Sequence, residues 1–90
     1  MAEPVFRVTI LTEEGRQYEN DAISIVAPGE LGLLGILAHH APLLTTLTPG
    51  LLTVRTPAGA VERFLVGHGL LEVLRNQLTI VTDRWAQEAA

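Results

Sequence analysis

Hydrophobic and polar residues alternate along most of this chain, in short segments separated by turn residues. In the first segment, residues 6–12, the apolar residues Phe6, Val8 and Ile10 occupy every second position. The same period of two recurs at 21–26, with Ile23 and Ile25 on one side, and at Leu52 and Val54. The segments 61–65, 70–74 and 78–82 are predicted to form hairpin strands. A period of two is typical of strands with one buried face, and only residues 84–90 could begin a helix. Short strands with turn signals about every 8 to 12 residues predict an all-β sandwich.

Glycine, proline and asparagine mark the turns between these segments, at 13–15, 27–30, 48–51, 56–59 and 75–77. After the first turn, Gln17 and Tyr18 begin the return strand. Proline followed by glycine at 27–30 and 48–51 predicts two type II turns. Gly67-His68-Gly69 predicts a bulge or a close approach of two backbone segments.

The stretch from Pro28 to Gly50 departs from this pattern. It holds four of the eight glycines, three of the five prolines and two of the three histidines, and the 24 residues 31–54 contain no Asp, Glu, Lys or Arg. The longest apolar run, 31–38, is too short for a membrane-spanning helix, which needs about 20 residues. Pro42 and Pro49 would interrupt any longer helix. We therefore expect irregular backbone here, partly buried and partly presented to an apolar partner.

Composition and charge narrow the function classes. Ninety residues make one domain with a modest core, and the absence of cysteine excludes a disulfide scaffold and a thiolate metal site. The net charge is −4 and there is no lysine, which argues against binding to nucleic acid or to anionic lipid head groups. The start of the chain lacks the features of a secretory signal. We expect a soluble intracellular protein with no cofactor, no small-molecule substrate and no direct membrane insertion.

A specific motif lies inside the uncharged stretch, Gly29-x-x-Gly32-x-x-Gly35-Ile-Leu-x-x-His40-Ala-Pro-Leu-Leu-Thr-x-Leu-x-Pro-Gly50. It resembles the signature of the epsilon subunit of F-type ATP synthases, which is called delta in mitochondria. The resemblance continues through Phe64-Leu-Val-Gly-His-Gly-Leu-Leu-Glu-Val73 and Leu78-Thr-Ile-Val-Thr-Asp83. It covers essentially the whole chain in order and spacing, which makes it far more specific than a lone glycine motif.

The resemblance implies a fold and a role. The family's amino-terminal domain is a flattened β-sandwich of about ten short, mostly antiparallel strands, which the resemblance places in residues 1–84. In most members two carboxy-terminal helices follow, which can inhibit ATP hydrolysis or bind ATP. Residues 85–90 form a short tail where that helical hairpin would begin, so we expect neither property. The implied protein is a non-catalytic central-stalk subunit that links the gamma subunit to the membrane c-ring and couples ion-driven rotation to ATP synthesis.

The resemblance also implies two contact sites and a location. The glycine loop of the family touches the c-ring, which implies contacts by Glu30, Leu31, Gly32 and Leu33. Glu30 is the charged candidate among them. The His-Ala-Pro segment lies near gamma, which implies contacts by His40, Ala41, Pro42, Leu44 and Thr45. The complex would lie at the cytoplasmic face of the bacterial plasma membrane, or at the matrix or stromal face in an organelle.

Alternatives remain at several of these residues. His40 could be a structural histidine that anchors its loop by hydrogen bonds. Many relatives have Gly at His39 and Pro at Ala38, so the turn here departs from the family pattern. His39, His40 and His68 could instead serve a small metal-dependent β-barrel enzyme, which is the alternative function. Adjacent side chains on an extended backbone point to opposite faces, however, so the first two cannot easily chelate one ion.

Two further interpretations concern the glycines and the leucines. Glycines at 29, 32 and 35 could suggest a phosphate-binding loop, but neither a helix pattern nor a lysine follows them. A free-standing ligand-binding sandwich is a third class of function.

The leucines at 43, 44, 47, 51 and 52 cannot all face inward on short strands. Unless both faces are covered within the sandwich, some should form an exposed apolar patch of the kind that marks a partner surface.

Overall fold

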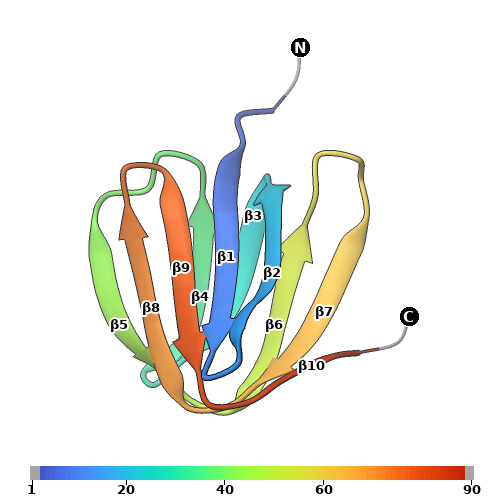
Figure 1. The fold of residues 1–90 in the computed structure, drawn as a ribbon. Helices are drawn as coiled ribbons and strands as arrows, with labels where there is room; N and C mark the ends of the chain where they lie inside the picture. Colours follow the sequence, from blue (N-terminus) through green and yellow to red (C-terminus); the bar gives the residue numbers. More distant parts are fainter. Residues whose placement is uncertain (1–2, 89–90) are drawn as a thin grey trace.

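Ten strands make up the fold of residues 3–88, the part of the chain that this computed structural model describes (Figure 1). They are β1 (Phe6–Thr12), β2 (Gly15–Ala22), β3 (Ser24–Gly29), β4 (Gly32–Leu37), β5 (Leu43–Leu47), β6 (Gly50–Arg55), β7 (Val61–Val66), β8 (Gly69–Leu74), β9 (Gln77–Thr82) and β10 (Trp85–Gln87). Residues 3–88 form no helix, and so none that could cross a membrane. The all-β prediction is confirmed.

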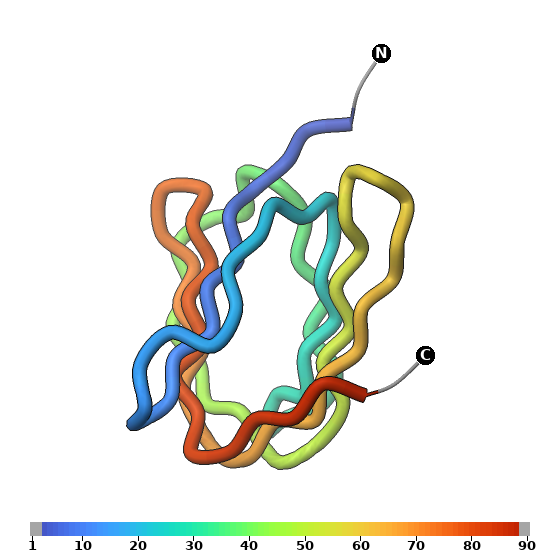
Figure 2. Tube along the Cα trace, turned by 45° about the vertical axis from the view of Figure 1, so that its right-hand side comes forward, coloured from blue at the N-terminus to red at the C-terminus, as the bar shows by residue number. Residues whose placement is uncertain are grey.

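The strands lie in two layers that face each other, which Figures 1 and 2 show from two directions. One layer has the order β4-β3-β6-β7-β10 and the other β5-β8-β9-β1-β2. The layers join where β3 pairs with β5 through one residue pair, Gly29 with Leu47. Every strand pair is antiparallel except β1 with β9, which is parallel. The fold is therefore a flattened, mostly antiparallel sandwich, as expected.

The core lies between the two layers and is largely aliphatic. Alternate residues of each long strand point into it, because successive side chains of a strand face opposite ways. The largest fully buried side chains are Val8, Ile10, Ile25, Ile36, Leu52, Val54, Phe64, Leu71, Leu78 and Ile80. Burying one such side chain contributes about 1.5 to 3 kcal/mol to stability. The positions that the alternation predicted to face one side are buried, at Phe6, Val8 and Ile10, at Ile23 and Ile25, and at Leu52 and Val54.

Three of the four aromatic residues close one side of the sandwich, where the outer strands β2 and β10 lie. Trp85 of β10 stacks on Phe64 of β7 with ring centroids 4.4 Å apart, and Tyr18 of β2 lies 4.7 Å from Phe64. The Tyr18 hydroxyl donates a hydrogen bond of 2.6 Å to Glu62 Oε1. We call this side, defined by Tyr18, Phe64 and Trp85, the aromatic seam. It holds the two layers together by side chains, where no ladder joins β2 to β10.

The Pro28–Gly50 stretch is not irregular, so that prediction is wrong. It contains β4 and β5, and β4 forms a hairpin with β3 around Glu30 and Leu31. The alternation in β4 is hidden in the sequence because its outward positions Leu33 and Leu37 are as apolar as the inward ones. An apolar run can therefore be an alternating strand when its outer face is leucine.

Both predicted type II turns are wrong as well. Pro28 and Gly29 belong to β3, and the glycine with positive φ in this hairpin is Gly32, at 129°. Gly50 starts β6 without a positive φ. Only glycine fits at position 50, because a β-carbon there would lie 2.9 Å from the Cβ of Pro28.

Two other turn predictions are confirmed. Gly69 marks a close approach, since a β-carbon there would collide with the carbonyl oxygen of Val81. Arg75 and Asn76 form the two-residue turn between β8 and β9, with φ of 51° and 63°. Two consecutive positive φ angles match the twist of a tight antiparallel hairpin.

The end of the described chain is a strand where the sequence suggested that a helix could begin. Trp85–Gln87 form β10 and pair with Val66, Leu65 and Phe64 of β7. The ring of Trp85 stacks on Phe64 at the aromatic seam, and pairing along β7 places it there. Residues 89–90 of the expected tail lie outside the described residues.

Candidate functional site

The loops of the sandwich gather at two opposite ends (Figure 1). The Glu30–Leu31 turn lies at one end, with the β5–β6 and β7–β8 connections, and we call this the glycine-loop end. Residues 38–42, between β4 and β5, lie at the other end beside the β8–β9 turn, and we call this the histidine end. A strand of about six residues separates the ends, which corresponds to about 20 Å. The Glu30–Leu31 turn and the loop at His40 therefore lie at opposite ends of the sandwich, whereas Leu44 and Thr45 lie along β5 between them.

The glycine-loop end projects a two-residue turn into solvent. Leu31 at its tip is fully exposed and Leu33 is 76% exposed. Gly29 and Gly32 face each other at the base of the turn. A β-carbon on Gly29 would lie 2.7 Å from the Gly32 carbonyl oxygen, whereas Gly32 has open space and a positive φ. Both glycines are thus required, one for close packing and one for backbone conformation.

Strand β5 holds Glu30 in place. Thr46 Oγ1 donates a hydrogen bond of 2.5 Å to Glu30 Oε2, and the backbone N–H of Glu30 donates to the Thr46 carbonyl at 3.3 Å. The N–H of Thr48 donates to the Pro28 carbonyl at 2.9 Å. The carboxylate of Glu30 is consequently fixed at the surface, where it can accept hydrogen bonds from donors of a partner protein. Sequence reasoning did not find Thr46, because no local pattern links two residues 16 positions apart.

The histidine end is built around an unusual backbone conformation. His39 has a φ of 63°, in the left-handed region that glycine adopts freely and other L-residues reach at a cost of about 1 to 2 kcal/mol. The resemblance places Gly here in many relatives, so the turn keeps a glycine-like geometry with a histidine. The N–H of His39 donates a hydrogen bond of 2.7 Å to Asn76 Oδ1.

The predicted gamma contacts differ in their position in the fold. His40, Ala41 and Pro42 are exposed in the loop, whereas Leu44 and Thr45 lie in β5. The Nδ1 atom of His40 lies 2.7 Å from the carbonyl oxygen of Ala41. This contact is local, so it does not tie His40 to a distant part of the domain.

Three leucines are exposed at outward-facing positions of β4 and β5, one strand from each layer. They are Leu33 and Leu37 on β4 and Leu44 on β5, and we refer to them together as the leucine edge. Leu44 lies opposite Glu72 of β8. Leu37 is 65% exposed and Leu44 is 67% exposed. The expectation that some leucines remain exposed is confirmed, because Leu47 and Leu52 are buried while Leu44 is not.

Strand β4 adds a second feature to the leucine edge. Within the described residues it pairs only with β3, so its other backbone edge has no ladder partner. Natural sheets usually protect such an edge with charged side chains, proline or a bulge. Strand β4 has none of these devices, since its sequence is GLLGIL and its register with β3 is regular. The leucine edge is therefore suited to being covered by another protein.

The structure does not bring the three histidines together. His39 and His40 lie at the histidine end, and His68 lies between β7 and β8 at the opposite end. Among residues 3–88, no group of three or more His, Cys, Asp or Glu residues could hold a metal ion. The alternative of a metal-dependent enzyme is therefore not supported. A phosphate-binding loop is also ruled out at Gly29–Gly35, because a strand follows the turn in place of a helix.

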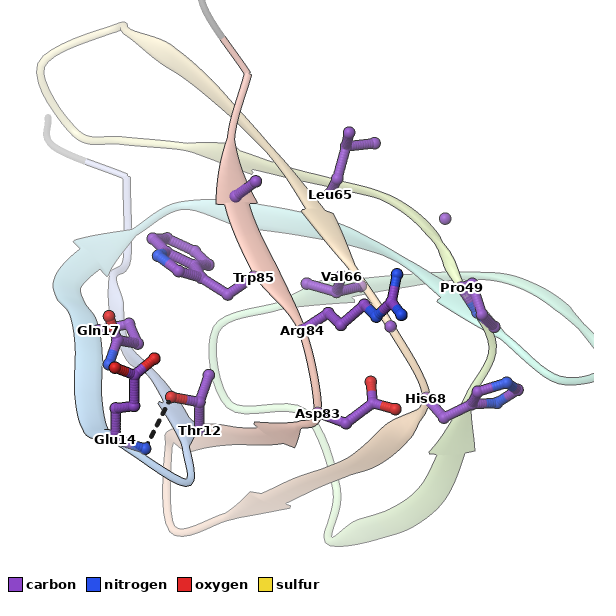
Figure 3. A pocket seen from close by; sticks show the side chains of 13 residues that line it. Thr12, Glu14, Gln17, Pro49, Leu65, Val66, His68, Asp83, Arg84 and Trp85 are labelled. Carbon is purple, nitrogen blue, oxygen red and sulfur yellow. Dashed lines mark hydrogen bonds between the residues drawn. The ribbon is translucent and has the colours of Figure 1, made fainter.

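An open groove of about 810 Å³ lies at the glycine-loop end, between the β1–β2 hairpin and the chain around β10 (Figure 3). Its lining comes from four separate parts of the chain, with Pro49, His68, Asp83, Arg84 and Trp85 among the residues. Sequence reasoning could not find a groove assembled in this way. In Figure 3 its polar side chains spread along the rim and do not converge on one point, which does not favour a small-ligand site.

Comparison with known proteins adds the family context. The family model described as ATP synthase, Delta/Epsilon chain, beta-sandwich domain matches residues 5–88. The chain is 46% identical over 78 residues to ATP synthase epsilon chain 2 of Burkholderia orbicola, covering 86% of this chain and 51% of that protein. It is 43% identical over 83 residues to the chloroplastic ATP synthase epsilon chain of Cyanidioschyzon merolae, covering 92% of this chain and 62% of that protein. The chain thus spans about half to three fifths of the length of these relatives.

Two solved structures have a similar fold. A chain of the Euglena gracilis mitochondrial ATP synthase assembly of OSCP, F1 and c-ring matches with a TM-score of 0.86 at 20% identity, covering 97% of this chain and 56% of that chain. A chain of the Tetrahymena thermophila mitochondrial ATP synthase central stalk and c-ring matches with a TM-score of 0.77 at 22% identity, covering 96% of this chain and 69% of that chain. At these identities the likeness concerns the fold.

Proposed function

This chain belongs to the delta/epsilon β-sandwich family of ATP synthase subunits, and we propose on that premise that it is a non-catalytic central-stalk subunit of a rotary F-type ATP synthase. It connects the gamma subunit to the c-ring, so that ion-driven rotation of the ring is transmitted to the catalytic head. The observation that carries the proposal is the family match over residues 5–88, with 46% identity to an ATP synthase epsilon chain. Such mechanical work needs shape complementarity and apolar burial, without a nucleophile or an acid–base pair.

The glycine-loop end is the part that contacts the c-ring in this proposal, through Glu30, Leu31, Gly32 and Leu33. Three features support this assignment. The turn projects from the end of the sandwich, its tip residue Leu31 is fully exposed, and Thr46 holds the Glu30 carboxylate in a fixed position. A thin turn with a positioned acceptor suits contact with polar loops of another subunit.

The gamma subunit binds the histidine end and the adjoining part of β5, through His40, Ala41, Pro42, Leu44 and Thr45. The exposed Leu44 on β5 and the exposed Leu37 at the histidine end of β4 support this assignment, because exposed leucines are readily covered by another protein. In this proposal the two partners contact different residues of one small domain, as a connecting subunit requires. The complex places the subunit at the cytoplasmic face of the bacterial plasma membrane, or at the matrix or stromal face in an organelle.

Replacing Leu44 with Asp tests this assignment. Leu44 is 67% exposed on β5, so the substitution leaves the core intact, but it puts a charge where gamma should bury a leucine. Losing the burial of one leucine corresponds to about tenfold to hundredfold weaker binding. The measurement is the affinity of the 90-residue chain for purified gamma subunit, by calorimetry, with circular dichroism to show that the variant is folded.

Leu65→Asp is the matched control. Leu65 is 51% exposed on β7, in the other layer and away from β5. Its substitution should change the affinity for gamma by less than about twofold, because a solvent-facing position contributes little to binding elsewhere. Wild-type affinity of the Leu44→Asp variant would show that gamma binds elsewhere. Failure of the wild-type chain to bind gamma would overturn the proposed function.

A further inference from the structure

Asn76 connects three segments of the histidine end that are distant in the sequence. Its side-chain oxygen accepts the hydrogen bond of 2.7 Å from the His39 N–H, and its side-chain nitrogen donates one of 2.9 Å to the Val5 carbonyl. Its own carbonyl accepts a hydrogen bond of 3.2 Å from the Arg7 N–H. One residue therefore ties the β8–β9 turn to the start of β1 and to the loop between β4 and β5.

The geometry of Asn76 makes these bonds possible. Its φ of 63° lies in the left-handed region, where asparagine is several-fold enriched among residues other than glycine. It occupies the second position of a two-residue turn. The β8–β9 ladder fixes the backbone of this turn, because its first pair, Leu74 with Gln77, directly flanks it. The side-chain amide is therefore held by a rigid hairpin and offers one acceptor and one donor in fixed directions.

The segment that Asn76 holds is the one that leads into the proposed gamma contact. His39 has a left-handed backbone and is followed directly by His40, Ala41 and Pro42, which are exposed. The contact of the His40 ring is with its neighbour Ala41, so it does not fix the direction of the loop. The hydrogen bond from His39 to Asn76 does fix it, because it joins the loop to a different hairpin.

We propose that Asn76 is a positioning residue that holds residues 40–42 in the conformation that the gamma subunit binds. The inference rests on the proposed function and adds a residue that the motif does not contain. A loop that is already ordered loses less conformational freedom when it binds, so the partner binds more tightly. Asn76 does not touch the partner in this proposal, and it acts through His39.

The test compares three variants of the 90-residue chain. Asn76→Gly keeps the positive φ without strain and removes both side-chain hydrogen bonds. Asn76→Asp keeps an oxygen acceptor for the His39 N–H and loses the donor to Val5. Arg75→Gly is the matched control, because Arg75 also has a positive φ in the same turn and its replacement leaves the amide of Asn76 in place.

Two measurements are made on each variant, hydrogen exchange at the His39 amide and affinity for purified gamma subunit. Asn76→Gly should speed His39 exchange by roughly tenfold or more and weaken gamma binding by about fivefold to tenfold, the loss expected for one or two hydrogen bonds. Arg75→Gly should stay within about twofold of wild type in both measurements. Asn76→Asp should fall between wild type and Asn76→Gly, because it keeps the acceptor for the His39 N–H but sets an oxygen against the Val5 carbonyl. Exchange at the Thr48 amide, at the glycine-loop end, should be unchanged in all variants.

The outcomes separate this inference from the proposed function. Wild-type affinity of Asn76→Gly would overturn the positioning role and leave the proposed function intact. An equal loss of affinity in Arg75→Gly would also overturn it, since the effect would then belong to turn stability in general. If the wild-type chain did not bind gamma, the proposed function would fail, and unchanged His39 exchange in Asn76→Gly would separately show that Asn76 does not order the loop.

Discussion

Gly32 and Gly35 lie three positions apart in the same hairpin, but only one of them is required by its backbone. Gly32 has a φ of 129°, whereas Gly35 has no positive φ and lies in regular β4. A β-carbon at either position would have nothing within 4 Å. Steric space is therefore the same at the two sites, and any difference between their substitutions reports backbone conformation alone.

We predict that Gly32→Val lowers the free energy of unfolding by about 1 to 3 kcal/mol, because valine is strained at a positive φ. Gly35→Val should leave it within about 0.5 kcal/mol of wild type, since β-branched residues suit an exposed strand position. Urea unfolding followed by circular dichroism measures both values. Equal stabilities of the two variants would show that the turn adjusts its backbone without strain.

The sequence identified the glycines of the glycine-loop end, but it did not assign the correct structural role to each of them. The motif singled out Gly29, Gly32 and Gly35 together, and the proline–glycine pair suggested a positive φ at Gly29. The structure assigns the positive φ to Gly32 and a close packing role to Gly29. A turn signal of two residues cannot show which of two nearby glycines closes a hairpin, because that depends on the register of β3 with β4.

Among the strands, β2 and β10 are positioned by the aromatic seam. These are the outer strands of the two layers, and Tyr18, Phe64 and Trp85 connect them through side chains. Burial raises the pKa of the Tyr18 phenol well above its ordinary value, and the hydrogen bond to Glu62 raises it further. The neutral phenol is therefore the form that fits the seam.

This shift predicts how stability changes at alkaline pH. Because the folded-state pKa of Tyr18 lies above the unfolded value of about 10, the unfolded chain releases its proton first as the pH rises. The contribution of Tyr18 to stability is complete below about pH 10 and is lost as the pH rises toward the folded-state pKa. The chain has one tyrosine and no lysine or cysteine, so Tyr18 is the only side chain that titrates in this range.

We therefore expect the free energy of unfolding to fall between about pH 10 and pH 11, and Tyr18→Phe to remove most of that fall. The phenolate absorbance of the folded protein should appear at a higher pH than in urea. At pH 7 the same variant should be less stable by about 0.5 to 1.5 kcal/mol, because it loses the hydrogen bond to Glu62. A folded protein in which Tyr18 ionises near pH 10 would contradict the effect of its partial burial and of its hydrogen bond to Glu62.

Some strands can be predicted from the sequence more readily than others. Segment 6–12 was predicted as a strand because every second residue, Phe6, Val8 and Ile10, is apolar, and all three are buried. Segments 61–65 and 78–82 were predicted from the turns that precede them. Strand β4 was missed because leucine occupies both of its faces. Strand β10 was missed because three residues are too few to show a period, and its place depends on the stacking of Trp85 on Phe64.

In the whole molecule, the Glu30 turn and the His40 loop lie at opposite ends of the sandwich, which the motif alone could not predict. Glu30 and His40 are ten positions apart in the sequence, and strand β4 carries them to opposite ends of the sandwich. The motif identified the residues of both regions in the order in which they occur. It could not identify Thr46 or Asn76, which support Glu30 and His39 across the fold.

Because the ends are separate, their functions should be separable in the assembled complex. Gly32→Val should leave gamma binding and ATP hydrolysis near wild type and should reduce proton pumping in reconstituted membrane vesicles, since it disturbs only the glycine-loop end. Pumping and hydrolysis are measured on the same preparation, with Gly35→Val as the control. Equal losses of both activities would indicate failed assembly, and no loss in either would remove the turn from the coupling step.

The parallel pairing of β1 with β9 delays the completion of the sheet during synthesis of the chain. Residues 7–11 find their partners at 77–81, so β1 cannot complete its sheet until about 70 further residues have been synthesised. Pairings between residues so distant in sequence form slowly, because a long loop must close first. Until then the β1–β2 hairpin has an open edge that is prone to aggregation. The nascent domain therefore depends on a late step, the arrival of β9, to become a single folded unit.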